Sequence, residues 1–271
     1  MKIKLPIVDG MFAHCHTTSD RPSDLMEWDR DNIKDYDFVF LTDDSLKLVD
    51  SLPNKRKYAW LVESPEITSG SYSWIKDNHN KFDKIFTFKK DILDTIENSK
   101  FLPIGGCWIH DIDRVANVNE KTKLISMVAS GKGQTSGHKL RHVVINSLRD
   151  KFDLYGRAYN PIDNKITSLK NYMFQIVIEN NKSDYYFTEK LIDCLQTGVI
   201  PIYWGCPSIC DFFDCNGIIN FNSLDELNSI LNSLTPDIYN QKKESISRNF
   251  ELSKKYVIAE HYLINNYIDE L

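Results

Sequence analysis

The sequence of 271 residues contains no apolar run that approaches the ~18 residues needed to span a membrane as a helix. Its six cysteines are too few for a disulfide scaffold, and the N-terminal stretch MKIKLPIVDG reaches Asp9 before an apolar signal segment can form. We therefore expect free thiols and a reducing, cytoplasmic compartment. The net charge of −5 lacks the basic excess of a generic nucleic-acid or membrane binder, which leaves only a local basic site.

Three groups of residues could be interpreted as metal-binding sites, but each is better explained without a metal. Cys206, Cys210 and Cys215 lack the tighter pair and the fourth ligand of a structural zinc site. Asp111–Asp113 (DID) has no glycine-rich turn to confine a cation, and the run 14–16 (HCH) is too compact for a tetrahedral site. We expect free thiols, a surface acidic triplet and a solvated loop, respectively.

Apolar residues make up 42% of the chain and aromatic residues 12%, which is enough for a sizeable core. Strand-like and helix-like segments alternate along the sequence, so we expect βαβ units and a mostly parallel sheet. The predicted strands span residues 36–41, 58–62, 84–88, 124–128, 152–155, 174–178, 199–204 and 217–221, the predicted helices span 138–150, 189–196 and 224–234, and 237–271 is expected to be helical.

The charges are unevenly distributed along the chain. Residues 121–183 carry 11 Lys and Arg against 4 Asp and Glu, whereas the stretches before and after them are net acidic. A basic stretch inside an acidic chain favours a local anion site, and a phosphorylated small molecule is its natural ligand. A polar run at 117–121 predicts a boundary between a domain of residues 1–120 and one of residues 121–271.

Two loops that follow predicted strands carry candidate chemistry. The loop 131–137 (GKGQTSG) opens a helix whose first turns carry Lys139 and Arg141, an arrangement that can bind phosphate although it is not a P-loop. A flexible turn and a solvated helix face are an equally good interpretation. Glu63 ends an apolar strand, and Glu66 follows shortly after it. A carboxylate at a strand tip is suited to act as a general base, and the alternative is a loop-capping role.

The stretch 174–207 (FQIVIENNKSDYYFTEKLIDCLQTGVIPIYWGCP) is the most informative. A buried strand ends before Asn180, and Glu189 and Lys190 stand in the first turn of the next helix. A lysine there opposes the helix dipole unless an anion is bound beside it. A sugar nucleotide would use Glu189 for its ribose hydroxyls, Lys190 for its diphosphate and Tyr186 against its flat base.

This stretch resembles the signature of glycosyltransferase family 10, the α1,3/α1,4-fucosyltransferases, and above all their bacterial branch. A looser resemblance extends from about residue 55 to about residue 221. The positions that carry the resemblance are Phe174, Glu179, Asn180, Tyr186, Thr188, Glu189, Lys190, Pro201, Gly205 and Pro207.

The resemblance assigns roles to individual residues. Bacterial members place their general base in a GENESP-like run after a strand, which here reads LVESPE; this implies Glu63 as the base if one residue is gapped, with Glu66 as the alternative. The residues implied to bind the donor are Arg141, Lys165, Asn180, Tyr186, Glu189 and Lys190.

The resemblance also implies a GT-B-like α/β fold of two Rossmann-like domains facing each other across a cleft. Residues 1–120 would hold the oligosaccharide acceptor, and residues 121–271, with their terminal helices, the nucleotide-sugar donor. The implied reaction is inverting transfer of L-fucose from GDP-β-L-fucose, with no essential metal although a divalent cation could stimulate it. Another nucleotide sugar, or a non-catalytic nucleotide- or glycan-binding protein, stays open as an alternative, as does a homodimer.

Overall fold

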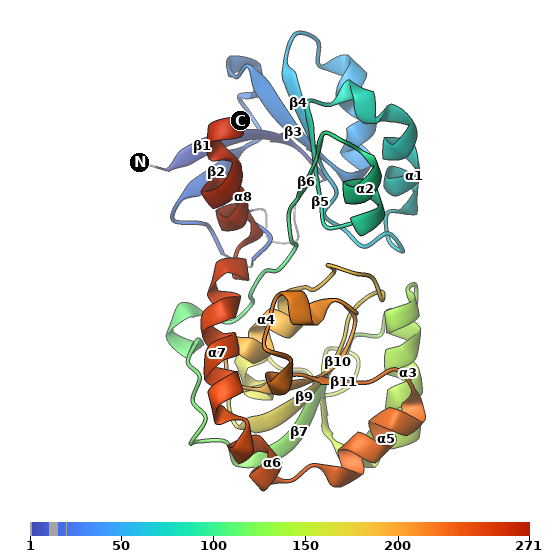
Figure 1. Cartoon of the computed structure of the whole chain (residues 1–271), viewed down its shortest axis with the longest axis vertical. Helices are drawn as coiled ribbons and strands as arrows, with labels where there is room; N and C mark the ends of the chain where they lie inside the picture. The colour runs from blue at the N-terminus through green and yellow to red at the C-terminus, as the bar shows by residue number, and fades with distance from the viewer. Residues whose placement is uncertain (1, 11–15, 20) are drawn as a thin grey trace. The chain divides into compact units, whose positions relative to one another are not determined.

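The computed structural model describes residues 2–10, 16–19 and 21–271, which form two compact α/β units (Figure 1). The first unit comprises the described parts of residues 1–106, 184–186 and 255–271, and the second comprises residues 107–183 and 187–254. The units are therefore not divided at residue 120. Residues 107–120 pack with the second unit, where Trp108 donates its backbone N–H to Asp193 and Ala116 lies against Gly198.

A parallel six-stranded sheet of order β2-β1-β3-β4-β5-β6 forms the centre of the first unit. Successive side chains point to opposite faces, so Val39 and Leu41 pack with α1, α2 and η2, whereas Phe40 packs with α8. The strands are β1 (Ile3–Val8), β2 (Met26–Asp29), β3 (Phe38–Thr42), β4 (Arg56–Trp60), β5 (Lys84–Thr87) and β6 (Ser99–Phe101), and the covering segments are η2 (Asp43–Ser51), α1 (Ser69–Asn78), α2 (Lys90–Thr95) and α8 (Ala259–Tyr267).

The C-terminal helix α8 belongs to the core of the first unit. Its Leu263 and Ile264 pack with Leu5 of β1. The buried Glu260 carboxylate accepts hydrogen bonds from the Thr18 hydroxyl at 2.8 Å and from the Trp28 indole N–H at 3.1 Å. These bonds satisfy a carboxylate that would otherwise be costly to bury, and they fix α8 beside the end of β2.

The second unit is built on a parallel five-stranded sheet of order β11-β10-β9-β7-β8. In the central strand β9, Ile176 packs among the side chains of α3 and α5, while Gln175 points to the other face and meets Cys194 of α4. The elements are β7 (Lys123–Val128), α3 (Ser136–Leu148), β8 (Asp153–Tyr155), β9 (Tyr172–Ile178), α4 (Glu189–Leu195), β10 (Ile200–Trp204), β11 (Ile219–Asn220), α5 (Leu224–Ser233), α6 (Pro236–Gln241) and α7 (Lys243–Ser253).

The cysteines differ from the sequence prediction at one place. Cys210 and Cys215 form a disulfide with Cα atoms 5.3 Å apart, so the expectation of free thiols is wrong for these two. The physical reason is that two short 3-10 turns, 209–211 and 215–217, fold the chain back within disulfide reach, which spacing alone does not reveal. Cys206 is a free, buried thiol. His14 and Cys15, of the expected solvated loop, lie outside the described residues.

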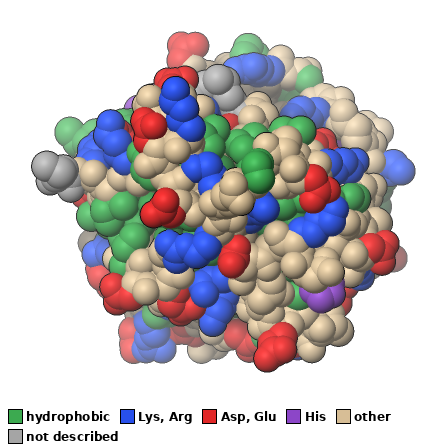
Figure 2. All heavy atoms as spheres, turned by 90° about the horizontal axis from the view of Figure 1, so that it is seen from above, with side chains coloured by type: hydrophobic (Ala, Val, Ile, Leu, Met, Phe, Trp, Pro, Cys, Tyr) green, Lys and Arg blue, Asp and Glu red, His purple; other side chains and the backbone are tan. Residues whose placement is uncertain are grey.

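The surface is of mixed character. On the face shown in Figure 2, acidic and basic side chains are interspersed, which agrees with the small net charge of −5. Within the described residues, no helix is both long and apolar enough to cross a membrane. No cluster of three or more His, Cys, Asp or Glu side chains suited to a metal ion occurs in that part of the chain either, and Asp111 instead pairs with Arg114.

Candidate active site

Helix α3 meets the carboxyl end of β9, and this contact brings two predicted donor-binding residues together. The Arg141 guanidinium donates to the Ile178 carbonyl at 3.0 Å and to the Asn180 side-chain oxygen at 3.1 Å. Arg141 is only 5% exposed, so its orientation is fixed by these acceptors. The close approach requires Gly137, because a Cβ there would lie 1.7 Å from the Glu179 carbonyl oxygen. Gly137, in the first turn of α3, therefore serves the packing of this helix against the end of β9.

The residue after β9 also holds the start of α4. Glu179 is fully buried, and its two carboxylate oxygens accept hydrogen bonds from the Thr188 backbone N–H at 2.9 Å and the Thr188 hydroxyl at 2.7 Å. Thr188 is the N-cap of α4, and its hydroxyl accepts the Lys190 backbone N–H. Because the carboxyl end of a strand is tied to the next helix, the side chains of the first turn of α4 are placed rigidly. The sequence places Glu179 in the family motif but does not predict that its carboxylate binds Thr188.

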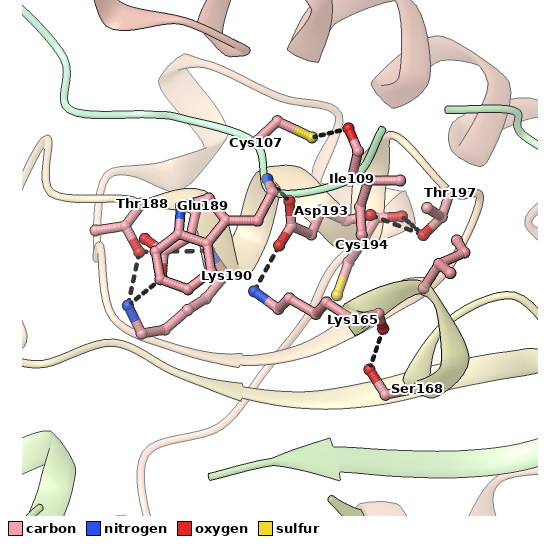
Figure 3. A network of polar contacts seen from close by, with 12 residues as sticks. Cys107, Ile109, Lys165, Ser168, Thr188, Glu189, Lys190, Asp193, Cys194 and Thr197 are labelled. Atoms are coloured by element: carbon pink, nitrogen blue, oxygen red, sulfur yellow. Dashed lines mark hydrogen bonds and ion pairs between the residues drawn. The ribbon is translucent and has the colours of Figure 1, made fainter. Parts of the chain in front are cut away.

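Lys190 and Glu189, both predicted donor-binding residues, lie in that first turn. The Lys190 ammonium is 2.9 Å from a Glu189 carboxylate oxygen and 3.0 Å from the Thr188 hydroxyl (Figure 3). It also lies 3.7 Å from a carboxylate oxygen of Glu179. Three oxygen groups therefore surround one ammonium group whose side chain is still 25% exposed. A cation with this exposure and these partners is available to an anionic ligand.

Lys165, the remaining predicted cation, is paired one helical turn along α4. Its ammonium lies 2.5 Å from the fully buried carboxylate of Asp193 and 5.3 Å from the centre of the Trp108 ring (Figure 3). The other oxygen of Asp193 accepts the Trp108 backbone N–H at 2.7 Å. Asp193 and Trp108 were not predicted. The signal for Asp193 is a charged residue between the apolar residues Ile192 and Cys194.

Neighbouring charges favour the ionised forms of Glu189 and Lys165. Burial opposes the ionisation of Glu189, but Lys190 and Lys165 outweigh it and lower its pKa to about 2. Burial favours the neutral amine of Lys165, but Asp193 and Glu189 raise its pKa above the ordinary lysine value. Burial alone dominates at Glu179, whose pKa is raised. The cluster therefore combines fixed cations with carboxylates, as a site for a phosphorylated sugar derivative requires.

Tyr186 does not lie in this cluster. It belongs to the first unit, where its ring is 2% exposed and lies 4.9 Å from the Phe88 ring, centre to centre. In this structure no face of the ring is open for a nucleotide base to lie against. The physical reason is that an apolar ring in a chain segment crossing between units is more stable in a core than exposed to water.

The two predicted base candidates lie in the first unit, just beyond the end of β4, and both side chains are exposed. The backbone of Glu63 is anchored by its carbonyl, which accepts the Tyr72 hydroxyl at 2.8 Å. Glu66 is held through its N–H, which donates to the Ser64 hydroxyl at 3.2 Å. Glu63 is thus the carboxylate nearer to the strand end.

Comparison with known proteins agrees with the motif. Residues 118–268 match a family model described as glycosyltransferase family 10 (fucosyltransferase) C-term. The α-(1,3)-fucosyltransferase FucT of Helicobacter pylori is 39% identical over 72 residues, 26% of this chain and 15% of that protein. Human GDP-fucose protein O-fucosyltransferase 3 is 26% identical over 224 residues, 70% of this chain and 44% of that protein. The chain thus spans less than half the length of these relatives.

Among solved structures, an α1,3-fucosyltransferase with GDP-fucose superposes with a TM-score of 0.59 at 18% identity. The superposition covers 94% of this chain and 90% of the other. At this identity the similarity concerns the fold. It confirms the expected GT-B-like architecture, in which two α/β units each carry a parallel sheet.

Proposed function

The chain belongs to glycosyltransferase family 10, and we propose that it transfers L-fucose from GDP-β-L-fucose to a hydroxyl group of a glycan with inversion at the sugar carbon. The observation that carries the proposal is the cluster of Lys190, Lys165 and Glu189 at the start of α4, inside the region matched by the family model. Arg141 lies at the adjacent strand end, with Asn180. These residues combine the charges needed for a diphosphate with a carboxylate suited to hydroxyl groups.

In this proposal, groups of the donor replace contacts that the cluster residues make with each other. The diphosphate takes the Lys190 ammonium from Glu189, which then accepts hydrogen bonds from the ribose hydroxyls. Lys165, held by Asp193, supplies a second fixed positive charge, and Arg141 keeps Asn180 in place beside the donor. The positive charges stabilise the negative charge that grows on the leaving GDP, so the scheme needs no metal ion.

The base of the proposed reaction is Glu63. An oxygen of its carboxylate takes the proton of the acceptor hydroxyl while the acceptor oxygen forms a bond to the anomeric carbon. The bond from that carbon to the phosphate oxygen breaks, and its electron pair leaves with GDP. Attack from the face opposite the leaving group converts the β-linked donor into an α-linked product. General-base assistance contributes roughly 10²–10⁴-fold to such a step.

The test of the donor assignment is calorimetry with GDP, UDP, ADP and CMP, each with and without EDTA. We expect GDP to bind most tightly and EDTA to leave its affinity unchanged. Tighter binding of UDP would mean that the donor is a UDP-sugar and not GDP-fucose, while the proposed glycosyl transfer would stand. Absence of binding by every nucleotide would contradict the enzymatic proposal and favour a glycan-binding protein.

The test of the base is the Glu63→Gln variant. We expect it to retain GDP affinity, because donor binding is assigned to the second unit, while release of GDP from GDP-fucose falls at least 100-fold. Glu66→Gln is the matched control, with the same change three residues away. If Glu66→Gln is the variant that loses turnover, the base moves to Glu66.

A further inference from the structure

Asp43 has a backbone conformation that few residues adopt. It directly follows β3 with φ +42°, in the left-handed region that Asp tolerates better than most side chains. This turn redirects the chain into η2 and leaves the Asp43 side chain beside the end of the neighbouring strand β4. Adjacent parallel strands end at the same edge of a sheet, and that edge carries the proposed base, Glu63.

The Asp43 carboxylate is bonded directly to the backbone of Glu63. One of its oxygens lies 3.1 Å from the Val62 nitrogen and 3.4 Å from the Glu63 nitrogen, and the other lies 3.3 Å from the Glu63 nitrogen. On its other side, Glu63 is held by the Tyr72 hydroxyl, which donates to its carbonyl oxygen at 2.8 Å. Both ends of the residue are therefore fixed, while its side chain stays exposed.

Asp43 is also poised to change its charge near neutral pH. Burial raises its pKa to about 7, against the N–H groups of Val62 and Glu63, which favour the ionised form. The other titratable groups around it are Asp44 and Glu63, whose negative charges add to the rise, and Tyr72 from α1.

We propose that Asp43 is a positioning residue of the transfer reaction: its carboxylate orients the backbone of Glu63 and, once ionised, strengthens the attraction of Glu63 for the acceptor proton. The inference rests on the proposed function, with Glu63 as the base. The proton of the acceptor hydroxyl still goes to Glu63, and Asp43 touches neither the donor nor the acceptor.

Two variants separate the geometry from the charge. Asn tolerates a positive φ, so Asp43→Asn keeps the turn and one acceptor oxygen but removes the charge. Gly also fits this conformation, and Asp43→Gly removes both the acceptor and the charge. Asp44→Asn is the matched control, because the Asp44 carboxylate accepts its hydrogen bond from the Ser71 hydroxyl and not from the backbone of Glu63. Release of GDP from GDP-fucose, with water as the acceptor, is followed from pH 5 to pH 9, and GDP affinity is measured by calorimetry.

We expect the wild-type kcat to rise in a step near pH 7 as Asp43 ionises. Asp43→Asn loses this step, and its kcat at pH 8 falls roughly 10-fold. In Asp43→Gly the kcat at pH 8 falls roughly 100-fold, because the backbone of Glu63 is no longer held in position. GDP affinity and KM for GDP-fucose stay within twofold of the wild type in both. Asp44→Asn retains the rate at pH 8 and still shows a step, which moves to lower pH because a negative charge that raises the pKa of Asp43 is gone.

If the folded Asp43 variants have wild-type rates while Glu63→Gln is inactive, the role of Asp43 is overturned and the assignment of Glu63 as the base stands. An active Glu63→Gln would instead overturn the assignment of the base on which the inference rests. If melting curves show that both Asp43 variants are unfolded, the wild-type profile decides, and a profile without a step near pH 7 overturns the inference.

Discussion

Lys165 and Asp193 form an ion pair of 2.5 Å in which the aspartate side chain is fully buried and the lysine side chain is 16% exposed. Removing one partner of such a pair leaves an uncompensated charge in a poorly solvated place. We expect Asp193→Ala to lower the free energy of unfolding by about 3–5 kcal/mol, measured by urea denaturation. Asp91→Ala is the control, because Asp91 is exposed and pairs with Lys76 at the surface, where less than about 1 kcal/mol is at stake. Equal losses in the two variants would contradict this.

Gly137 lets α3 approach β9. A methyl group at Gly137 would collide with the Glu179 backbone, so we expect Gly137→Ala to lower stability by about 1–3 kcal/mol and to weaken GDP binding by moving Arg141. Gly133→Ala, in the same loop, adds its methyl group to open space and should change neither quantity. Melting temperatures and GDP titrations of the two variants provide the measurement. An unchanged Gly137→Ala protein would mean that the helix can shift without cost.

Lys190 is the most exposed cation of the cluster, and we assign it to the diphosphate. A charge-assisted hydrogen bond contributes about 1.5–3 kcal/mol, so Lys190→Ala should weaken GDP binding at least 10-fold in calorimetry. Lys254→Ala removes the same charge from an exposed pair with Glu251 and should bind GDP normally. Affinity within twofold of the wild type for Lys190→Ala would remove Lys190 from the donor site.

His138 makes stability depend on pH. Burial, and then the nearby charges of Arg141, Lys132 and Lys190, lower its pKa to about 4 from the ordinary 6.5. Between these values the unfolded chain binds the proton and the folded chain does not, so stability is lost as pH falls from 6.5 to 4, by up to about 3 kcal/mol. His138→Gln keeps a side-chain acceptor for the capping box with Thr135 but should show a smaller loss over this range. An identical pH dependence in the variant, measured by urea denaturation, would contradict this origin.

The sequence predicted the strands and helices of the second unit better than those of the first, where it missed β1, β2, β6, α1 and α2. β9 and α4 were placed because the spacing of their apolar residues is a local signal. β1 was missed because Lys4 and Pro6 interrupt its apolar residues, and β2 and β6 because two residues of each are polar. Their place in the sheet comes from neighbours far along the chain, which no local pattern records.

For the candidate site, too, the sequence predicted residues that belong to local motifs and missed one that depends on a distant partner. Arg141 and Asn180 were both predicted, and they meet in the structure. Asp193 was missed because a buried charge is recognised only once its partner, Lys165, is known. Tyr186 was assigned to a nucleotide base because the motif is continuous in sequence, whereas the fold places this one residue in the core of the first unit.

The position of α8 in the first unit has a consequence for synthesis on the ribosome. The second unit is complete once residue 254 has left the exit tunnel, whereas the first still lacks residues 255–271. Until then, the face of its sheet that carries Phe40, Tyr58 and Phe86 has no helix over it. The segment translated last therefore completes the unit translated first, and the unit inserted between residues 106 and 255 has all of its residues earlier.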